Sequence, residues 1–92
     1  MAEKILYKIT IKGRVQGVGY RWNAAREAIN RDINGFAKNL SDGSVYIEAE
    51  GKSEQLDSFV EWCNKGPRLS IVESVTVNVY PAVNYSEFRI EH

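Results

Sequence analysis

Apolar and polar residues alternate along several stretches of the chain. In the first stretch every second residue is apolar: Ile5, Tyr7, Ile9 and Ile11. A period of two in β-branched and aromatic residues predicts a strand with one buried face. Residues 44–50 and 71–80 alternate in the same way, and shorter strands are predicted at residues 35–40 and 88–90.

The segment after the first strand has helical spacing instead. Trp22, Ala25 and Ile29 recur three or four residues apart, as on one face of a helix. They predict a helix over residues 21–32, with Trp22 in the core or at its edge. Gly35, or the asparagine before it, is expected to end this helix in the left-handed conformation.

A second helix is predicted between the third strand and Gly66. Its apolar residues fall at positions i, i+3, i+4 and i+7: Leu56, Phe59, Val60 and Cys63. Ser53 is a suitable N-cap, and Gly66-Pro67 stops the helix. We interpret Cys63 as a buried, inert thiol and expect Trp62 in the core or at its edge.

The predicted elements follow the order β-α-β-β-α-β, with a short strand at the end. Two helical crossovers on one face of an antiparallel sheet give the ferredoxin-like split βαβ fold, an α+β architecture. The 92 residues contain no internal repeat or linker, so residues 1–92 are expected to form a single domain. This fold alone does not determine function, because metal chaperones, RNA binders and enzymes share it.

Charge and cysteine content exclude several functions. The 12 Lys and Arg residues balance 12 Asp and Glu residues, so the chain lacks the positive excess that attracts nucleic acid or an acidic membrane. One cysteine and one histidine are too few for a structural zinc site or an intrachain disulfide. With no secretory signal and no membrane-spanning apolar run, we expect a cytoplasmic monomer without a metal.

A glycine-rich loop, GRVQGVGYR, runs from Gly13 to Arg21 and contains no acid. Backbone N–H groups at a helix N-terminus lack partners within the helix, so such a loop can hold an anion. The stretch matches neither the GxGxxG nor the P-loop pattern, and a plain turn stays equally open. Arg21 favours the anion site, because a cation in a first helical turn costs roughly 0.3–1 kcal/mol unless an anion compensates for it. A solvated Arg21 paired with a surface acid is the alternative.

Two motifs resemble the signatures of the acylphosphatase family. The first is the loop itself, in which glycine precedes Val-Gln-Gly-Val, an aromatic residue and an arginine. The second is Gly-aromatic-x-x-Asn at residues 35–39, followed by Gly43, Val45 and Gly51. On these motifs the chain is identified as a member of that family over nearly its whole length.

The resemblance implies hydrolysis of acyl phosphates, the mixed anhydrides of carboxylic acids and phosphate, to carboxylate and inorganic phosphate. It implies that Arg21 binds the phosphoryl group and that Asn39 positions the attacking water. No metal or cofactor is implied, and inorganic phosphate is expected to be product and competitive inhibitor. Backbone amides of the loop would complete the phosphate site: Val15, Gln16, Gly17, Val18, Gly19 and Tyr20.

Tyr20 departs from the family pattern, in which phenylalanine is usual, and its hydroxyl is expected at an edge of the core or in solvent. The side chains of Arg14 and Gln16 are expected to support the shape of the loop or to face solvent. Asn39 alone would be interpreted as a turn residue, but the motif around it favours a functional role.

The residue types agree with this chemistry independently of the resemblance. An acyl phosphate expels a carboxylate whose conjugate acid has a pKa of about 4, so no general acid is required. Stabilisation of charge and orientation of water remain, and an arginine, backbone amides and an asparagine supply both.

Two alternatives stay open. A relative of the acylphosphatase-like module of carbamoyl-transfer maturation proteins would process carbamoyl phosphate without free acylphosphatase activity, but the zinc-finger cysteines of those proteins are missing. A ferredoxin-like binding module would need a CxxC motif for metal, or exposed aromatic residues in a basic surface for RNA. The sequence contains neither feature.

Overall fold

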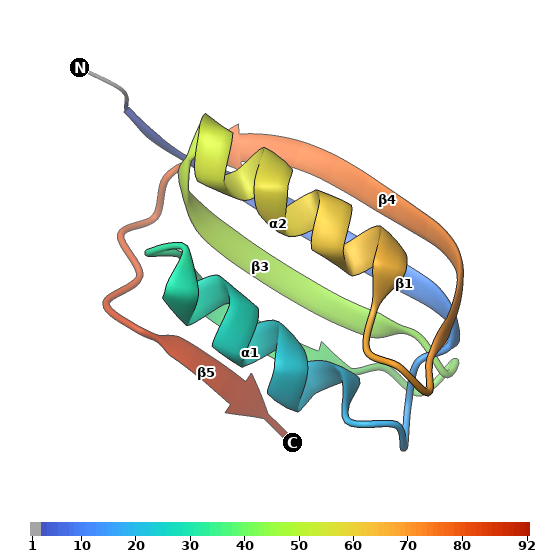
Figure 1. Cartoon of the computed structure of the whole chain (residues 1–92). Helices are drawn as coiled ribbons and strands as arrows, with labels where there is room; N and C mark the ends of the chain where they lie inside the picture. The colour runs from blue at the N-terminus through green and yellow to red at the C-terminus, as the bar shows by residue number, and fades with distance from the viewer. Residues whose placement is uncertain (1–2) are drawn as a thin grey trace.

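The computed structural model describes residues 3–92, and its elements follow the predicted order (Figure 1). The strands are β1 (Lys4–Arg14), β2 (Asn34–Asn39), β3 (Val45–Lys52), β4 (Ile71–Pro81) and β5 (Phe88–Glu91). The helices are α1 (Tyr20–Asn30) and α2 (Ser53–Lys65). Neither helix is long and apolar enough to cross a bilayer.

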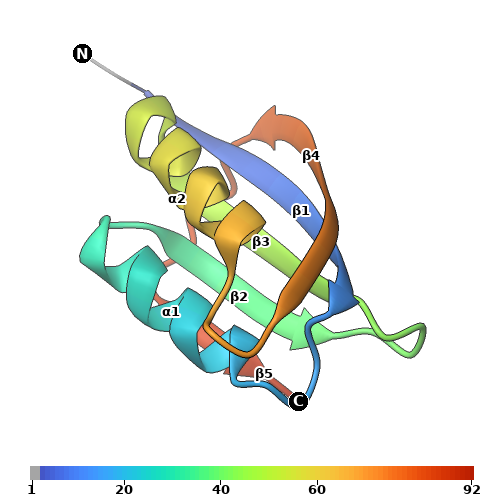
Figure 2. The same ribbon diagram turned by 45° about the vertical axis from the view of Figure 1, so that its right-hand side comes forward.

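The strands form one sheet in the order β4-β1-β3-β2-β5. β1 pairs antiparallel with β3 and β4, and β3 pairs antiparallel with β2, as predicted. β5 pairs parallel with β2, so the complete sheet is mixed. Both helices lie on the same face of the sheet (Figures 1 and 2), which is the ferredoxin-like arrangement.

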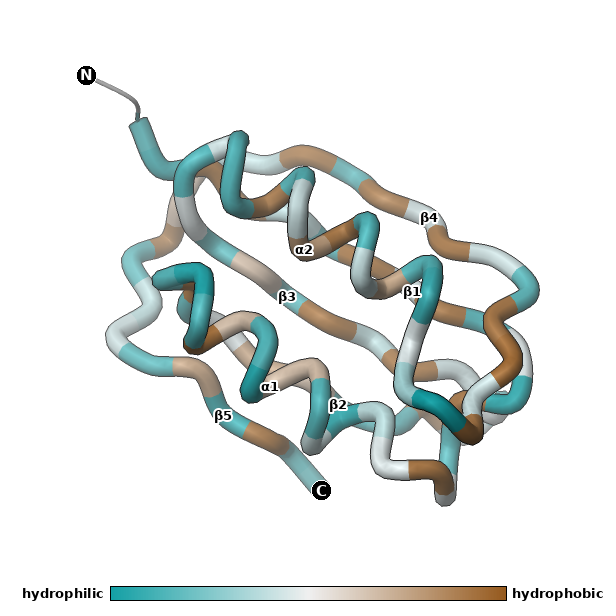
Figure 3. The backbone as a smooth tube through the Cα atoms, viewed as in Figure 1, coloured by the Kyte–Doolittle hydropathy of each residue, from teal (hydrophilic) through white to brown (hydrophobic). Residues whose placement is uncertain are grey.

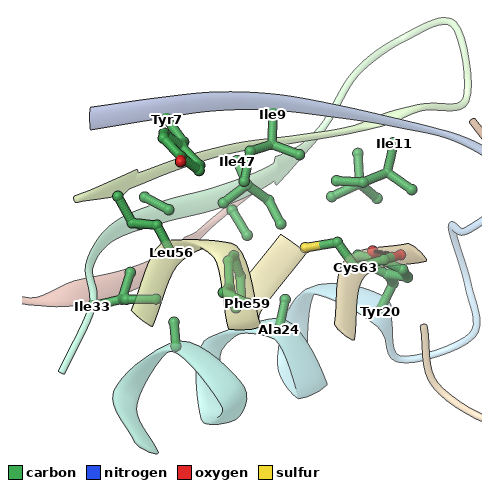
Figure 4. Packing of buried hydrophobic residues seen from close by; sticks show 14 of the residues in the cluster. Tyr7, Ile9, Ile11, Tyr20, Ala24, Ile33, Ile47, Leu56, Phe59 and Cys63 are labelled. Carbon is green, nitrogen blue, oxygen red and sulfur yellow. Dashed lines mark hydrogen bonds between the residues drawn. The ribbon is translucent and has the colours of Figure 1, made fainter. Parts of the chain in front are cut away.

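The core lies between the sheet and the two helices. Ile9 and Ile11 of β1 point toward the helices and are fully buried. Figure 3 shows a similar alternation of apolar and polar residues along β4. Leu56, Phe59 and Cys63 of α2 pack against the strands (Figure 4). Because burial of a large apolar side chain stabilises the fold by about 1.5–3 kcal/mol, this contact holds α2 to the sheet.

Helix α1 buries Ala25 of its predicted face, which is 7% exposed, but turns the two larger residues of that face away from the core. Tyr20, Ala24 and Ala28 are buried, whereas Trp22 is 69% exposed and Ile29 is 59% exposed. The buried residues follow the spacing i, i+4 and i+8, and the small alanines face the sheet where a larger side chain would hold the helix away. The prediction that Trp22 lies in the core or at its edge is therefore wrong.

The helix boundaries also differ in part from the prediction. After α1 it is Asp32 that adopts a left-handed φ of 57°, in place of Gly35 or the asparagine before it. Gly35 lies inside β2, where a Cβ would meet the carbonyl oxygen of Glu48 at 1.8 Å, so strand packing requires this glycine. Ser53 is the first residue of α2, and the N-cap is Lys52.

A buried carboxylate holds the connection between β4 and β5 against the sheet. Glu50 is 2% exposed and accepts hydrogen bonds from the backbone N–H groups of Val83, Asn84 and Tyr85. Charge-assisted bonds of this kind are stronger than those between neutral groups, so they offset the burial of the charge. The anchor directs the chain toward β5 at the edge of the sheet.

The hydroxyl of Tyr20 lies inside the core, so the expectation that it reaches an edge or solvent is wrong. It donates a 2.7 Å hydrogen bond to the main-chain carbonyl of Cys63 near the end of α2. The last carbonyls of a helix lack partners within the helix, and a phenylalanine could not satisfy this one. The ring packs 5.3 Å, between centroids, from that of Trp62, which is half-buried as predicted.

Replacing Tyr20 with phenylalanine removes this bond and leaves the Cys63 carbonyl buried without a donor. We expect the free energy of unfolding to fall by about 1–3 kcal/mol, as measured by urea denaturation at pH 7. The control is Tyr80→Phe, at a position that is 43% exposed. This variant should change the free energy by less than about 0.5 kcal/mol, and equal losses in both variants would contradict the role of Tyr20.

Cys63 is fully buried, as predicted, and burial raises the pKa of its thiol from the ordinary 9.0 to about 12. The unfolded chain releases this proton near the ordinary value, whereas the folded chain retains it. The thiol therefore contributes stability that is fully present below pH 9 and is lost as the pH rises toward 12.

Between pH 8 and pH 10 the wild type should lose about 1 kcal/mol more unfolding free energy than Cys63→Ala. Urea denaturation of both proteins at the two pH values, with reductant present, measures this difference. The buried tyrosines titrate in both proteins and cancel. Identical pH dependence would show that the thiol ionises as easily in the folded chain as in the unfolded one.

Candidate active site

The glycine-rich loop leaves β1 at Arg14 and enters α1 at Tyr20. Gly17 and Gly19 have positive φ angles of 73° and 79°, which residues with a Cβ rarely adopt. Among residues 3–92, the backbone N–H groups of residues 16–19 find no hydrogen-bond acceptor. Successive free N–H groups beside a helix N-terminus form a concavity suited to an anion.

A cavity of about 230 Å³ brings most of the predicted site residues together. The loop, the first turn of α1, the end of β2 and the C-terminal residues form its walls: Val15, Gly17, Gly19, Tyr20, Arg21, Trp22, Asn39, Ile90 and His92. Arg21 and Asn39 thus border one space although they belong to different elements. Gln16 and Val18 are the two predicted loop residues that do not line it.

Gln16 ties the loop to the turn between β2 and β3. Its side-chain nitrogen donates hydrogen bonds of 2.8 Å to the carbonyl oxygen of Leu40 and 2.9 Å to that of Ser44. Leu40 directly follows Asn39, so the two bonds fix the loop relative to the strand end that carries Asn39. This agrees with the expectation that Gln16 supports the shape of the loop, and Arg14 is exposed.

Two other loop residues anchor the loop in the core. Val18 is half-buried and packs against the hydrophobic cluster. Tyr20 is 1% exposed and bonded to α2 as described above. The loop is therefore held by Gln16 at the hairpin and by Val18 and Tyr20 at the core.

Arg21 extends from the first turn of α1, which contains no acidic residue. The side chain is half-buried, and its Nη1 donates a 2.7 Å hydrogen bond to the carbonyl oxygen of Glu91. Within residues 3–92 no carboxylate forms an ion pair with Arg21, so the surface ion pair considered above is not formed. A neutral carbonyl orients the guanidinium without cancelling its charge, and other N–H groups stay available to an anion.

Asn39 is the last residue of β2, is exposed, and lies opposite Val45 of β3. Beyond it the N–H of Leu40 donates to the carbonyl of Ser44 at 2.9 Å and closes the turn. The hydroxyl and the N–H of Ser44 donate to Asp42 at 2.6 and 2.9 Å, and these bonds lower the pKa of that carboxyl. A braced hairpin therefore presents the amide of Asn39 to the cavity.

Trp22, Ile90 and His92 line the cavity but are absent from the predicted site. Ile90 and His92 reach it because β5 pairs parallel with β2, and no local pattern in the sequence signals that pairing. Trp22 is assigned to the core by its spacing, and only its exposure identifies it as a border of the cavity. In the part of the chain that the structure describes, no cluster of His, Cys, Asp and Glu is placed to hold a metal ion.

Known proteins match both the sequence and the fold. The family model described as Acylphosphatase matches residues 7–90. An acylphosphatase of Vibrio parahaemolyticus is 42% identical over 82 residues, which cover 89% of this chain and 88% of that protein. The crystal structure of acylphosphatase from Bacillus subtilis has a TM-score of 0.93 and 38% identity, covering 96% of this chain and 99% of that one.

A larger protein contains the same fold as one part of its chain. Full-length HypF, crystallised in a phosphate- and nucleotide-bound form, has a TM-score of 0.88 and 25% identity over the whole of this chain, but only 12% of HypF is covered. The two acylphosphatases are instead matched over most of their own length. The chain therefore belongs to the acylphosphatase family.

Proposed function

We propose that the chain hydrolyses acyl phosphates to a carboxylate and inorganic phosphate, with residues 1–92 acting as one domain. Membership of the acylphosphatase family supports the reaction. The observation that carries the assignment of residues is the shared cavity, in which Arg21 of α1 and Asn39 of β2 border one space with the glycine-rich loop.

In this proposal the phosphoryl group binds in the loop. The free N–H groups of residues 16–19 donate to its oxygens, and the guanidinium of Arg21, oriented by the carbonyl of Glu91, donates two further bonds. Fixed donors of this kind stabilise the charge that develops on the phosphoryl oxygens, and they need no reorganisation during the reaction.

Asn39 orients the water that attacks phosphorus. Its side-chain amide has an oxygen that accepts from water and an NH₂ group that donates to a phosphoryl oxygen. The bond between water oxygen and phosphorus forms while the bond from phosphorus to the acyl oxygen breaks, and the electron pair leaves with the carboxylate. The proton of the water passes to the phosphate product or to solvent, because the carboxylate, whose conjugate acid has a pKa of about 4, leaves without it.

Inorganic phosphate, the product, occupies the same loop and competes with the substrate. The balanced charge and the single buried thiol suit a monomer in the reducing cytoplasm that uses no metal, membrane or nucleic acid. This part of the proposal depends on composition and is independent of the cavity.

Variants of Arg21 and Asn39 distinguish binding of the phosphoryl group from the attack of water. We expect Arg21→Ala and Asn39→Ala each to lower kcat for benzoyl phosphate by about 100- to 1000-fold, in the presence of EDTA, because each removes a fixed contact to the reacting group. Inhibition by inorganic phosphate should be lost in Arg21→Ala and kept in Asn39→Ala. Initial rates followed by release of phosphate provide both readouts.

The matched controls are Arg89→Ala on β5 and Asn64→Ala on α2, two exposed residues outside the cavity. Both should retain wild-type rates. Full activity in the Arg21 or Asn39 variant would overturn the residue roles, and an inactive wild type would overturn the proposed reaction.

Gln16→Ala tests whether the tie between loop and hairpin positions Asn39. Loss of both carbonyl contacts should lower kcat roughly 10- to 100-fold, since small misplacements of a reacting group cost this much. Inhibition by phosphate should change little, because the loop and Arg21 remain. Gln16→Glu, which cannot donate to the two carbonyls, should lower kcat as the alanine variant does. The control Arg14→Ala, at a nearby exposed residue, should keep the wild-type kcat. Equal weakening of turnover and phosphate inhibition would assign Gln16 to phosphate binding instead.

A further inference from the structure

Helix α1 carries exposed apolar side chains that the packing of the fold does not use. Trp22 and Ile29 are 69% and 59% exposed, and Ala25, which is only 7% exposed, lies between them with the spacing i, i+3 and i+7 of a single helix face. A lone exposed apolar residue is ordinary in a soluble protein. Two large exposed apolar side chains on one helix face go beyond this, and apolar surface of this kind is typical of a region that binds a ligand.

This patch begins at the active-site cavity. Trp22 lines the cavity together with Arg21 and Asn39, and it also lines a shallow groove of about 250 Å³ along α1. Ala25, Arg26, Ile29 and Asn30 form the rest of that groove. Trp22 therefore borders both spaces, and we call the second one the acyl groove.

The acyl groove has the shape and polarity for an apolar chain. Ile29 lies seven positions after Trp22, which at the helical rise per residue spaces them about 10 Å apart along the axis. The guanidinium of Arg26 is turned to Asn23, to whose side-chain oxygen it donates a 3.0 Å bond. Its aliphatic stem is left as part of the wall.

We propose that the acyl groove binds the acyl part of the substrate and that the enzyme prefers acyl phosphates with apolar chains of medium length. The proposal rests on the proposed function, because the phosphoryl group must sit in the loop for its acyl chain to pass Trp22. Arg21 and Trp22 are neighbours in the sequence, so one helical turn holds the phosphoryl end and the start of the chain. Removal of the chain from water along α1 supplies the preference.

A series of substrates of increasing length measures this preference. Butyryl, hexanoyl and octanoyl phosphate expel carboxylates of equal basicity, so differences in kcat/KM report contacts of the chain and not chemistry. A groove contacts the acyl chain on one side only, so we expect about half the transfer free energy of each methylene. This raises kcat/KM about twofold per methylene, or roughly 10- to 20-fold from butyryl to octanoyl phosphate.

Two variants locate the contact along the helix. Trp22→Ala should reduce the kcat/KM for octanoyl phosphate to about threefold that for butyryl phosphate or less. Trp22→Phe should restore most of the wild-type ratio. In Ile29→Ser, kcat/KM should still rise from butyryl to hexanoyl phosphate. It should no longer rise from hexanoyl to octanoyl phosphate. The control is Leu69→Ser, because Leu69 is 71% exposed but lies outside both spaces, and this variant should keep the wild-type ratios.

Several results would overturn the proposal. A wild type that hydrolyses all three substrates at one kcat/KM refutes the acyl groove and leaves the proposed function intact. A wild type inactive on the three substrates and on benzoyl phosphate refutes both. If Leu69→Ser flattens the series as much as Trp22→Ala, the effect is not specific to this groove. If sedimentation shows that the wild type is a dimer and Ile29→Ser a monomer, a second copy covers the patch instead of the acyl chain.

Discussion

The direction of three strands determines where the residues of the candidate active site come together. β1 and β2 both run antiparallel to β3, so they run parallel to each other, and β5 runs parallel to β2. The chain therefore leaves all three strands at the same end of the sheet (Figure 2). The loop after β1, Asn39 at the end of β2 and His92 after β5 meet there, although they come from distant parts of the sequence.

Contacts within the fold hold the loop in place. Gln16 bonds to the hairpin after β2, Val18 packs on the core, and the hydroxyl of Tyr20 bonds to the end of α2. Ordering a flexible residue costs about 1–2 kcal/mol, so under the proposed function a loop held by these contacts leaves more of the interaction with phosphate available for binding and catalysis. The two positive φ angles at Gly17 and Gly19 complete a shape that the surrounding contacts then maintain.

The sequence was sufficient to predict the order of elements and the residues of the two family motifs, because both are local patterns. Arg21 and Asn39 lie in short stretches whose spacing identifies them without knowledge of the fold. The spacing wrongly assigns Trp22 to the core or its edge because α1 has two adjacent faces with helical spacing. Hydrophobicity favours the face with the larger residues, whereas the alanines of the other face pack on the sheet. The bond of Tyr20 to α2 and the place of β5 depend on contacts between distant segments, which no local pattern contains.

The position of β5 at the sheet edge affects which part of the protein opens first on heating. β5 is a four-residue strand at the edge of the sheet whose only strand partner is β2, and its Glu91 carbonyl accepts a hydrogen bond from Arg21 while its end forms one wall of the cavity. Short edge segments open in sub-global fluctuations that need only a fraction of the global unfolding free energy. Detachment of β5 would remove the Glu91 carbonyl from Arg21 and one wall from the cavity, whereas the antiparallel pairing of β1, β2, β3 and β4 does not involve β5. On heating we therefore expect this edge to open before the core unfolds, so that Arg21 and one wall of the cavity lose their support first.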